Sequence, residues 1–530
     1  AAAAGGGKKD VLMIAIDDMR PELGCYGCDY MKTPSMDALA SESLVFDRMY
    51  TGVAVCSPAR TLLLTTRRAD TSRVWTISAQ EYWRKSGGNF TSLPQHFREK
   101  GYLTLGTGKI FHPGPPSGNS DSKYSWSPEC LPYLNTFPEP GGSNIYTSPA
   151  VHPINASDNE MGEGKLALNA VRLLEFIAGA RANKSDTRPF FMAAGFHRPH
   201  IPWHAPTKYY DMYELDMPLA PNLHLPKGLP LIAANNNWVG KDFNYTDPVT
   251  GYTTNASNGY WTRSFKDLAS VPVSPHMPVD GSAVPQEEQK RVRQAYRAAI
   301  SFTDRNIGVV IAAAKRLNLY QDAVVVLWSD HGYQLGDNAQ YGKHTNFEHA
   351  TRIPFMVRMP PSSFPSFKPG RTTALVENVD LYPTLAEVAL GMPMERCPED
   401  VKESRATDTC TEGLSFAPVL ANPAIQWKAG SFSQYNRMGE TVMGYTVRTP
   451  EWRFTQWVQF NKSLAGVPGG AEWPKTLGTE LYSHSTAVTP CNWDYESENV
   501  AHDSANAQVV ARLDKLLIAG WRAALPPSAK

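Results

Sequence analysis

The chain has 530 residues, 42% of them hydrophobic, which is enough for a sizeable core in one large domain and one smaller domain. Its 51 basic and 51 acidic residues cancel, so the composition excludes a protein that binds nucleic acid or an anionic membrane through bulk charge. No apolar run approaches the roughly 20 residues of a membrane-spanning helix. Any recognition of an anion must therefore depend on a local site.

Three short apolar runs predict buried strands, and each ends in acidic or imidazole side chains. They lie at residues 10–18, 189–200 and 323–332. Continuous apolar strands are typical of a sheet that helices cover on both faces. The segment 287–318 has the apolar spacing and acidic start of such a covering helix. We therefore expect an α/β fold whose ligand lies beyond the carboxyl ends of the strands.

The remaining segments predict long loops and a second unit. Residues 114–160 and 200–285 are rich in Pro, Gly, Ser and Asn and predict ordered loops over the sheet, where substrate contacts concentrate. Alternating residues such as 441–460 predict an antiparallel sheet, followed by a helix at 506–525. We expect a larger domain over residues 1–420 and a smaller α+β domain over residues 421–530.

Sequons and cysteines indicate the secretory pathway. Six Asn-x-Ser/Thr sequons are typical of passage through an endoplasmic reticulum: Asn89, Asn155, Asn183, Asn244, Asn255 and Asn461. Seven cysteines become six once Cys56 is set aside. Cys397 and Cys410 flank a short charged loop and are the predicted disulfide. Several pairings are open to the other four, which are Cys25, Cys28, Cys130 and Cys491.

Acidic residues at two strand ends predict a cation site. Asp17 and Asp18 close the first strand, and Asp330 with His331 closes the third. Carboxylates that converge in one cleft repel each other unless a cation lies between them, and oxygen ligands favour Ca²⁺ or Mg²⁺ over zinc. The alternative for each acid is a structural one, in which it caps a turn or a helix.

Basic and imidazole side chains flank the same strand ends. A cation, an arginine, lysines and imidazoles together suit a tetrahedral oxyanion ester, either a sulfate or a phosphate. A lone histidine or lysine in a loop is more often a surface residue, so the hypothesis depends on their clustering. The candidates are Arg60, Lys109, His112, His197, His200 and Lys343.

Cys56 lies in the segment CSPAR, residues 56–60. A cysteine of a secreted chain is most often half of a disulfide, but it can also be a buried thiol or the precursor of a catalytic group. The segment resembles the Cys-x-Pro-x-Arg signature of the formylglycine-dependent sulfatases. Ala59 and Thr66 stand where the commonest signature has serine and glycine.

The resemblance extends over nearly the whole chain and is greater to the iduronate-2-sulfatases within that family. It includes IDDMRPELGCYG, HRPHIPW, SDHGYQLGDNAQYGKHTNFEHATRIPF and MGYTVRTPEWRFTQWVQF, in the family's order, between residue 11 and about residue 484. It implies an alkaline-phosphatase-like fold with a large mixed sheet, and a lysosomal or extracellular sulfate ester hydrolase.

The resemblance also implies a role for each matching residue. Formylglycine-generating enzyme would oxidise Cys56 to formylglycine; one hydroxyl of the hydrated aldehyde attacks sulfur, and deprotonation of the other lets sulfate leave. Arg60 and Lys109 would hold the hydrate, and His112 would act as its base. His200 and Lys343 would bind the sulfate and assist the leaving oxygen. One Ca²⁺ would be bound by Asp17, Asp18, Asp330, His331 and the modified Cys56.

The implied substrate is a 2-O-sulfated iduronate of heparan or dermatan sulfate, which carries a carboxylate beside its sulfate. Candidates for an additional cation that binds this carboxylate are His204, Lys208 and Arg352. Three alternatives remain: another sulfated polysaccharide as substrate, a phosphoester hydrolase of the same superfamily, and a non-catalytic glycan binder in which Cys56 is never oxidised.

Overall fold

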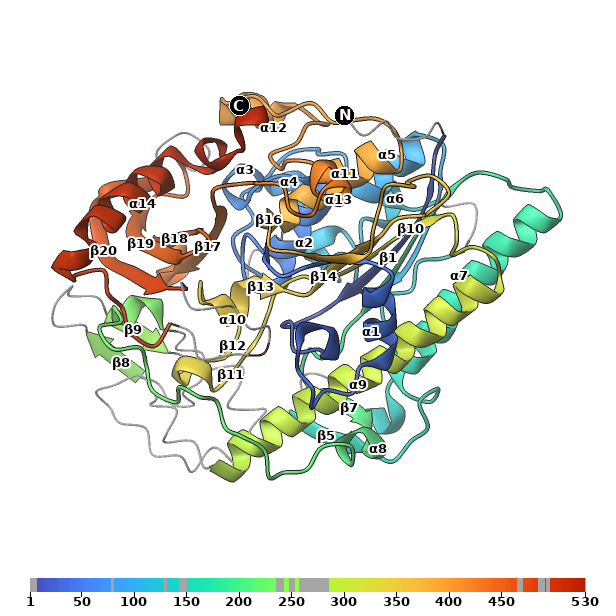
Figure 1. Cartoon of the computed structure of the whole chain (residues 1–530), viewed down its shortest axis with the longest axis horizontal. Helices are drawn as coiled ribbons and strands as arrows, with labels where there is room; N and C mark the ends of the chain where they lie inside the picture. Colours follow the sequence, from blue (N-terminus) through green and yellow to red (C-terminus); the bar gives the residue numbers. More distant parts are fainter. Residues whose placement is uncertain are drawn as a thin grey trace.

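A seven-stranded mixed sheet forms the centre of the computed structural model (Figure 1). The structure describes residues 7–77, 81–127, 131–142, 150–234, 243–246, 253–256, 286–464, 470–484, 491 and 496–529. In this sheet β14 is antiparallel to both of its neighbours, and the other adjacent strands are parallel. The strand order is β15 (Gly370–Thr372), β2 (Leu44–Phe46), β14 (Phe355–Arg358), β10 (Ala323–Ser329), β1 (Asp10–Ile16), β6 (Phe190–Phe196) and β4 (Leu103–Gly108).

The side chains of the central strand β1 alternate between two hydrophobic cores. Leu12, Ile14 and Ile16 face the core beneath the long helices, whereas Val11 and Met13 face the opposite core. One face is covered by α1 (Pro34–Ser41), α7 (Gly162–Ala182) and α9 (Gln286–Arg316), and the other by α2 (Cys56–Thr65), α5 (Leu93–Glu99) and α11 (Leu381–Val388) (Figure 1). The predicted sheet with helices on both faces is therefore confirmed.

A separate four-stranded antiparallel sheet follows, with a helix packed on it (Figure 1). The predicted helix at 506–525 ends early, because Gly520 adopts a φ of 75° and the chain continues as a short 3-10 turn. Residue 420 as a domain boundary stays a prediction. The elements are β17 (Ser431–Arg437), β18 (Val442–Arg448), β19 (Trp452–Phe460), β20 (Ala471–Ser483) and α14 (Ala507–Ala519).

Short elements occupy the predicted loops. The loop at 114–160 contains α6 (Ser122–Ser125) and β5 (Val151–Ile154), and β5 pairs with β7 (Trp203–Pro206). Most of the loop predicted at 200–285 lies outside the described residues. Further short elements are β3 (Met49–Tyr50), α3 (Ala69–Ser72), α4 (Trp83–Ser86), α8 (Thr207–Tyr210), β8 (Phe243–Thr246), β9 (Thr253–Ala256), β11 (Gln334–Leu335), β12 (Tyr341–Gly342), α10 (Glu348–Thr351), β13 (Arg352–Ile353), β16 (Val376–Glu377), α12 (Val401–Ala406) and α13 (Ala417–Ala421).

The described residues form two disulfides, one that closes a local loop and one that joins distant parts of the chain. Cys397 and Cys410 are bonded, as predicted from their spacing. Cys28 is bonded to Cys491, which is one of the pairings that the sequence left open. Cys25 and Cys56 carry free thiols, and Cys130 lies outside the described residues.

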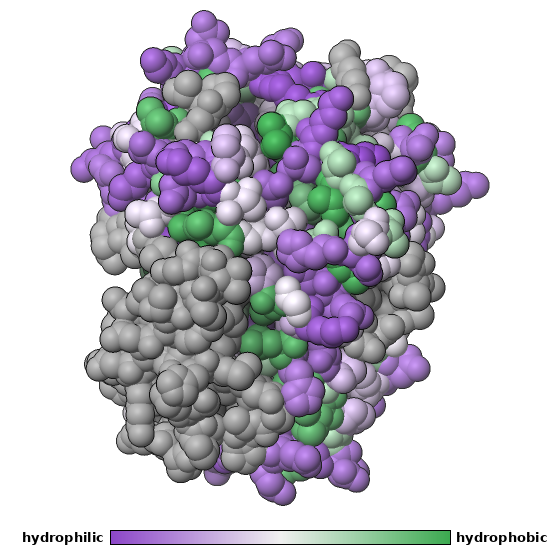
Figure 2. Space-filling view, turned by 90° about the vertical axis from the view of Figure 1, so that its left-hand side faces the viewer, coloured by the Kyte–Doolittle hydropathy of each residue, from purple (hydrophilic) through white to green (hydrophobic). Residues whose placement is uncertain are grey.

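The described surface over the C-terminal sheet is mostly hydrophilic, with small hydrophobic areas between the polar residues (Figure 2). Among the helices of the described ranges, none is both long enough and apolar enough to cross a membrane.

Candidate active site

Segments that follow the strands of the main sheet, the start of α2 and the residue after β12 bring the predicted site residues together. Asp17 and Asp18 follow β1, Lys109 follows β4, and Asp330 follows β10. These strands are parallel neighbours in the sheet or are joined through β6, so their carboxyl ends reach the same edge. Cys56 joins these residues as the first residue of α2.

Cys56 is completely buried at the N-terminus of α2. The preceding residue Val55 is extended, with a φ of −159°, and Pro58 in the first helical turn suits this start because it needs no amide donor there. The Cys56 Sγ lies 3.1 Å from Lys343 Nζ and 3.3 Å from His331 Nε2. Burial raises the pKa of this thiol to about 12, so it is not a ready thiolate nucleophile at neutral pH.

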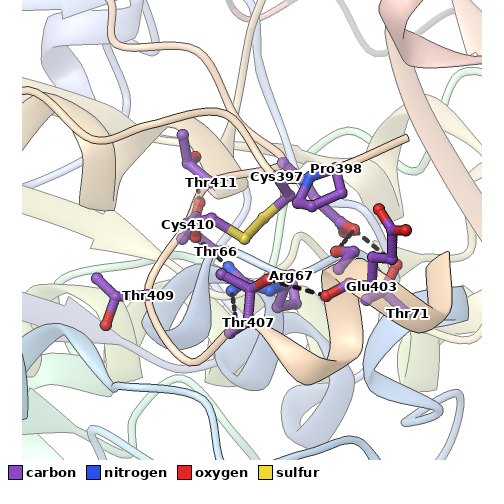
Figure 3. The surroundings of a disulfide bond; sticks show 12 residues. Thr66, Arg67, Thr71, Cys397, Pro398, Glu403, Thr407, Thr409, Cys410 and Thr411 are labelled. Atoms are coloured by element: carbon purple, nitrogen blue, oxygen red, sulfur yellow. Dashed lines mark hydrogen bonds between the residues drawn. A yellow bond between two sulfur atoms is a disulfide. The ribbon is translucent and has the colours of Figure 1, made fainter. Parts of the chain in front are cut away.

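The C-terminal end of α2 is held by the loop that the Cys397–Cys410 disulfide closes (Figure 3). Arg67 donates to the carbonyl oxygens of Cys410 and Thr407. Thr66 has a φ of 51°, in the left-handed region that favours glycine. Its hydroxyl shares a 2.7 Å hydrogen bond with Thr411 Oγ1, which stabilises threonine at a position where the sulfatase signature has glycine.

Arg60 donates hydrogen bonds to two of the three carboxylates of the site. Its Nε donates to Asp330 Oδ2 at 2.8 Å, and its Nη2 donates to Asp17 Oδ1 at 3.3 Å. The same guanidinium donates to the carbonyl oxygens of Lys109 and Ile110. One completely buried arginine therefore joins the segments that follow β1, β4 and β10.

Two buried lysines complete the charge balance. Lys109 Nζ donates to Asp17 Oδ2 at 2.5 Å, and Lys343 Nζ donates to both Asp18 Oδ1 and Cys56 Sγ. With Arg60, these lysines match the three carboxylates of the site. A bound divalent cation would therefore give the cluster a net positive charge suited to an oxyanion.

Three histidines at the site are held neutral. Burial lowers the pKa of His112 to about 3, and the neighbouring Lys109 charge lowers it further. Burial and the Lys343 charge also hold the pKa values of His200 and His331 well below the usual range. The His112 Nδ1 contacts the Pro113 carbonyl at 3.0 Å, and the His200 Nδ1 contacts the Ile201 carbonyl at 2.6 Å. Neutral imidazoles of this kind can accept a proton.

The donor groups fit a hard metal ion. Ligand atoms of Asp17, Asp18, Cys56 and His200 lie within 4.8 Å of one another, and so do those of Asp17, Cys56, Asp330 and His331. Asp18 Oδ2 is buried and has no hydrogen-bond partner in the described part of the chain. Burial raises the pKa of Asp18 to about 6 and that of Asp330 to about 7. A cation bound nearby would stabilise the charged form of both carboxylates.

Several sequence candidates lie in other contacts. His197 Nδ1 lies 3.2 Å from Glu163. His204 lies 3.6 Å from Glu139, and the exposed Lys208 pairs with Asp158 at 2.8 Å. Arg352 is buried in β13, where its charge acts on Tyr50 and Glu348.

Two tyrosines that lie near the site were not predicted from the sequence. Tyr296 of α9 contacts the main chain of Asp18, and Tyr435 of β17 contacts His344, which follows Lys343. Neither tyrosine lies in a motif, and no local pattern distinguishes them from core residues. Only the tertiary arrangement places them at the site.

A sheet with helices on both faces, and with acids, lysines and imidazoles at its strand ends, is suited to the hydrolysis of oxyanion esters. Comparison with known proteins narrows this class. The Sulfatase family model matches residues 9–392. The chain therefore belongs to the sulfatase family and is a sulfuric ester hydrolase.

Individual relatives agree with this assignment. The chain is 33% identical to iduronate 2-sulfatase of Mus musculus over 509 residues, which cover 86% of this chain and 85% of that protein. It is 32% identical to iduronate 2-sulfatase of Homo sapiens over 506 residues, 85% of each chain. The crystal structure of phosphonate monoester hydrolase of Agrobacterium radiobacter shares the fold, with a TM-score of 0.67, 18% identity and coverage of 97% and 95% of the two chains.

Proposed function

We propose that this sulfatase uses formylglycine derived from Cys56, together with one Ca²⁺, to remove the 2-O-sulfate from iduronate of heparan or dermatan sulfate. The observation that carries the proposal is the position of the Cys56 side chain. It lies 3.1 Å from Lys343 Nζ and 3.3 Å from His331 Nε2, inside the group of converging carboxylates. A nucleophile at this position meets the cation site and the anion-binding lysine together.

The proposed Ca²⁺ would be held by Asp17, Asp18, Asp330, His331 and residue 56. A thiol at residue 56 would add a soft sulfur to this set, whereas a hydrated aldehyde would add an oxygen, the donor that Ca²⁺ prefers. When bound, the ion supplies electrostatic stabilisation of the negative charge that develops on the sulfate oxygens.

The side chains around the proposed Ca²⁺ would each have a separate role in the reaction. Arg60 would fix Asp17 and Asp330, because its guanidinium already joins both. Lys109 and Lys343 would neutralise sulfate oxygens, and the neutral His112 would accept the proton whose removal from the hydrated aldehyde releases sulfate. His200 would lie on the side of the leaving sugar oxygen.

The identity to the two iduronate 2-sulfatases supports the substrate proposal, because it extends over about 85% of each chain. Six sequons and two disulfides support passage through the secretory pathway, where formylglycine-generating enzyme would modify Cys56. We place the mature protein in the lysosome or outside the cell.

Peptide mass spectrometry tests the nucleophile. Trypsin should release residues 49–60 from the active, denatured protein with an aldehyde in place of the Cys56 CH2–SH group. The free thiol of Cys25 is the internal control, because it should remain a cysteine. A fully active preparation with only thiol at Cys56 would disprove the formylglycine mechanism. An inactive protein that binds glycan and keeps Cys56 unoxidised would support the alternative of a non-catalytic glycan-binding protein.

A substrate panel tests the specificity. We expect a higher kcat/KM for a 2-sulfated iduronate disaccharide than for a 6-sulfated glucosamine, a small aryl sulfate or a phosphonate monoester. A preference for either of the other sulfates would remove the iduronate assignment and leave the sulfatase mechanism. A preference for the phosphonate would favour a phosphoester hydrolase. The phosphonate monoester hydrolase of Agrobacterium radiobacter has a similar fold.

A further inference from the structure

The turn that carries Asp18 depends on contacts from outside its own segment. Asp18 has a φ of 62°, in the left-handed region that side chains other than glycine adopt rarely, although aspartate does so more often than most. The turn follows β1 directly and also carries Asp17, so its conformation sets the direction of two carboxylates. Such a turn persists only where neighbouring groups hold it.

A single hydroxyl on α9 bridges this turn. Tyr296 Oη donates to the Asp18 carbonyl oxygen at 2.7 Å and accepts from the Arg20 backbone N–H at 2.9 Å. Burial holds the pKa of this phenol well above its usual value, so it keeps the proton that it donates. The bridge therefore joins the main chain on both sides of Met19.

The strand end beside the turn supplies two further contacts. Ser329 Oγ accepts from the Met19 backbone N–H at 3.0 Å. Asp330 Oδ1 accepts from the Asp18 backbone N–H at 3.2 Å. Tyr296 thus complements one contact from the last residue of β10 and one from the residue after it. Of these three groups, Tyr296 is the one that lies on a helix.

The Tyr296 ring also joins the other site segments. It stacks on Tyr333 at 5.4 Å between ring centroids and meets Trp203 edge-on at 6.2 Å. Trp203 and Tyr333 contact each other at 6.2 Å, and all three rings are at most 1% exposed. Trp203 lies three residues after His200, and Tyr333 three residues after Asp330.

We propose that Tyr296 is a positioning residue of the metal site, which holds the Asp17–Asp18 turn through its hydroxyl and the His200 and Asp330 segments through its ring. The proposal depends on the Ca²⁺ assigned in the proposed function. A tyrosine with only a packing role would direct its hydroxyl elsewhere or share it with groups remote from the site.

Tyr296→Phe is the decisive variant, because it deletes the bridge and keeps the ring. Tyr26→Phe is the matched control. Tyr26 is equally buried, and its hydroxyl accepts from the Phe355 N–H at 2.9 Å and donates to the Phe46 carbonyl at 3.0 Å. Both variants therefore lose a phenol that bridges main-chain groups, but only Tyr296 contacts the metal-site turn.

Calcium affinity is measured on the full chain by thermal shift, after chelation and stepwise return of Ca²⁺, with sulfatase activity followed in parallel. We expect the Kd for Ca²⁺ to rise about 10- to 100-fold in Tyr296→Phe, the usual effect of losing a partner that orients metal ligands. In Tyr26→Phe it should stay near the wild-type value. Excess Ca²⁺ should restore the kcat of Tyr296→Phe, whereas a defect that is merely structural would not respond to the ion.

Two results would overturn the proposal in different ways. If the wild type binds Ca²⁺ and Tyr296→Phe binds it equally well, Tyr296 has no positioning role and the proposed function is untouched. If Ca²⁺ does not stabilise the chelated wild type at any concentration, the calcium assignment itself is wrong, and the positioning role toward it is wrong as well.

Discussion

Tyr435 of the C-terminal sheet shares a 2.6 Å hydrogen bond with Nδ1 of His344, the residue that follows Lys343. His344 has a φ of 72°, and its backbone N–H donates to the Ala54 carbonyl at 3.1 Å, two residues before Cys56. The second sheet is therefore in contact with the segments that carry both the proposed nucleophile Cys56 and the proposed sulfate-binding residue Lys343.

Replacing Tyr435 with phenylalanine should lower kcat/KM about fivefold, from the loss of roughly 1 kcal/mol of hydrogen bonding. The reason is that the His344 ring, and with it the Lys343 segment, loses a fixed partner. Tyr445→Phe is the control, because it removes a 2.8 Å hydrogen bond to Asp70 from the same sheet. Equal activity losses in the two variants would show that the effect is a general weakening of the sheet.

Asp330→Ala should abolish turnover and destabilise the fold, because it removes the closer of the two carboxylates that pair with the buried Arg60 and leaves only Asp17. Chelation should lower the melting temperature of the wild type but not of this variant. Asp322→Ala, at the exposed opposite end of β10, should behave like the wild type in both measurements. A variant that still responds to chelation would place the ion elsewhere.

Thr66→Gly and Thr66→Ala should differ in stability. Glycine relieves the left-handed strain at φ 51° while losing the Thr411 and Val379 hydrogen bonds, so its net effect should stay within about 1 kcal/mol. Alanine loses the same hydrogen bonds and keeps the strain, so it should cost about 1 kcal/mol more. Urea unfolding measures both variants, and an alanine variant as stable as the glycine variant would contradict this account.

His96 should make the fold acid-sensitive. Burial lowers its pKa from the usual 6.5 to about 4, so between these values the unfolded chain binds the proton more tightly than the folded chain. The stabilisation from the neutral ring is complete above pH 6.5 and is lost as the pH falls toward 4, by about 3 kcal/mol in all.

His96→Phe should therefore reduce the loss of unfolding free energy between pH 7 and pH 4.5, measured by urea unfolding at each pH. The substitution of the exposed His502 by glutamine is the control and should leave the loss unchanged. If the wild type and His96→Phe lose stability in parallel, other groups account for the acid sensitivity.

Local patterns in the sequence were sufficient for three of the seven strands of the main sheet and for the residues at their ends. The apolar runs became β1, β6 and β10, because a strand buried on both faces must be apolar along its whole length. The helix predicted at 287–318 is α9, Gln286–Arg316. The candidate acids and histidines come directly after these strands in the sequence, so they could be identified once the strands were predicted.

Strand order, partners and long-range bridges required the tertiary structure. The pairing of β14 with β2, the Cys28–Cys491 disulfide over 463 residues and the Tyr296 contact join segments hundreds of residues apart, and the Tyr435 contact joins residues 91 apart. A hydrophobic period reports only which face of an element is buried, and it says nothing about which element covers that face. The sequence by itself therefore determined the residue types of the site and their place at the strand ends. The packing of α9 and of the C-terminal sheet, driven by burial over the whole chain, decided which distant side chains contact that site.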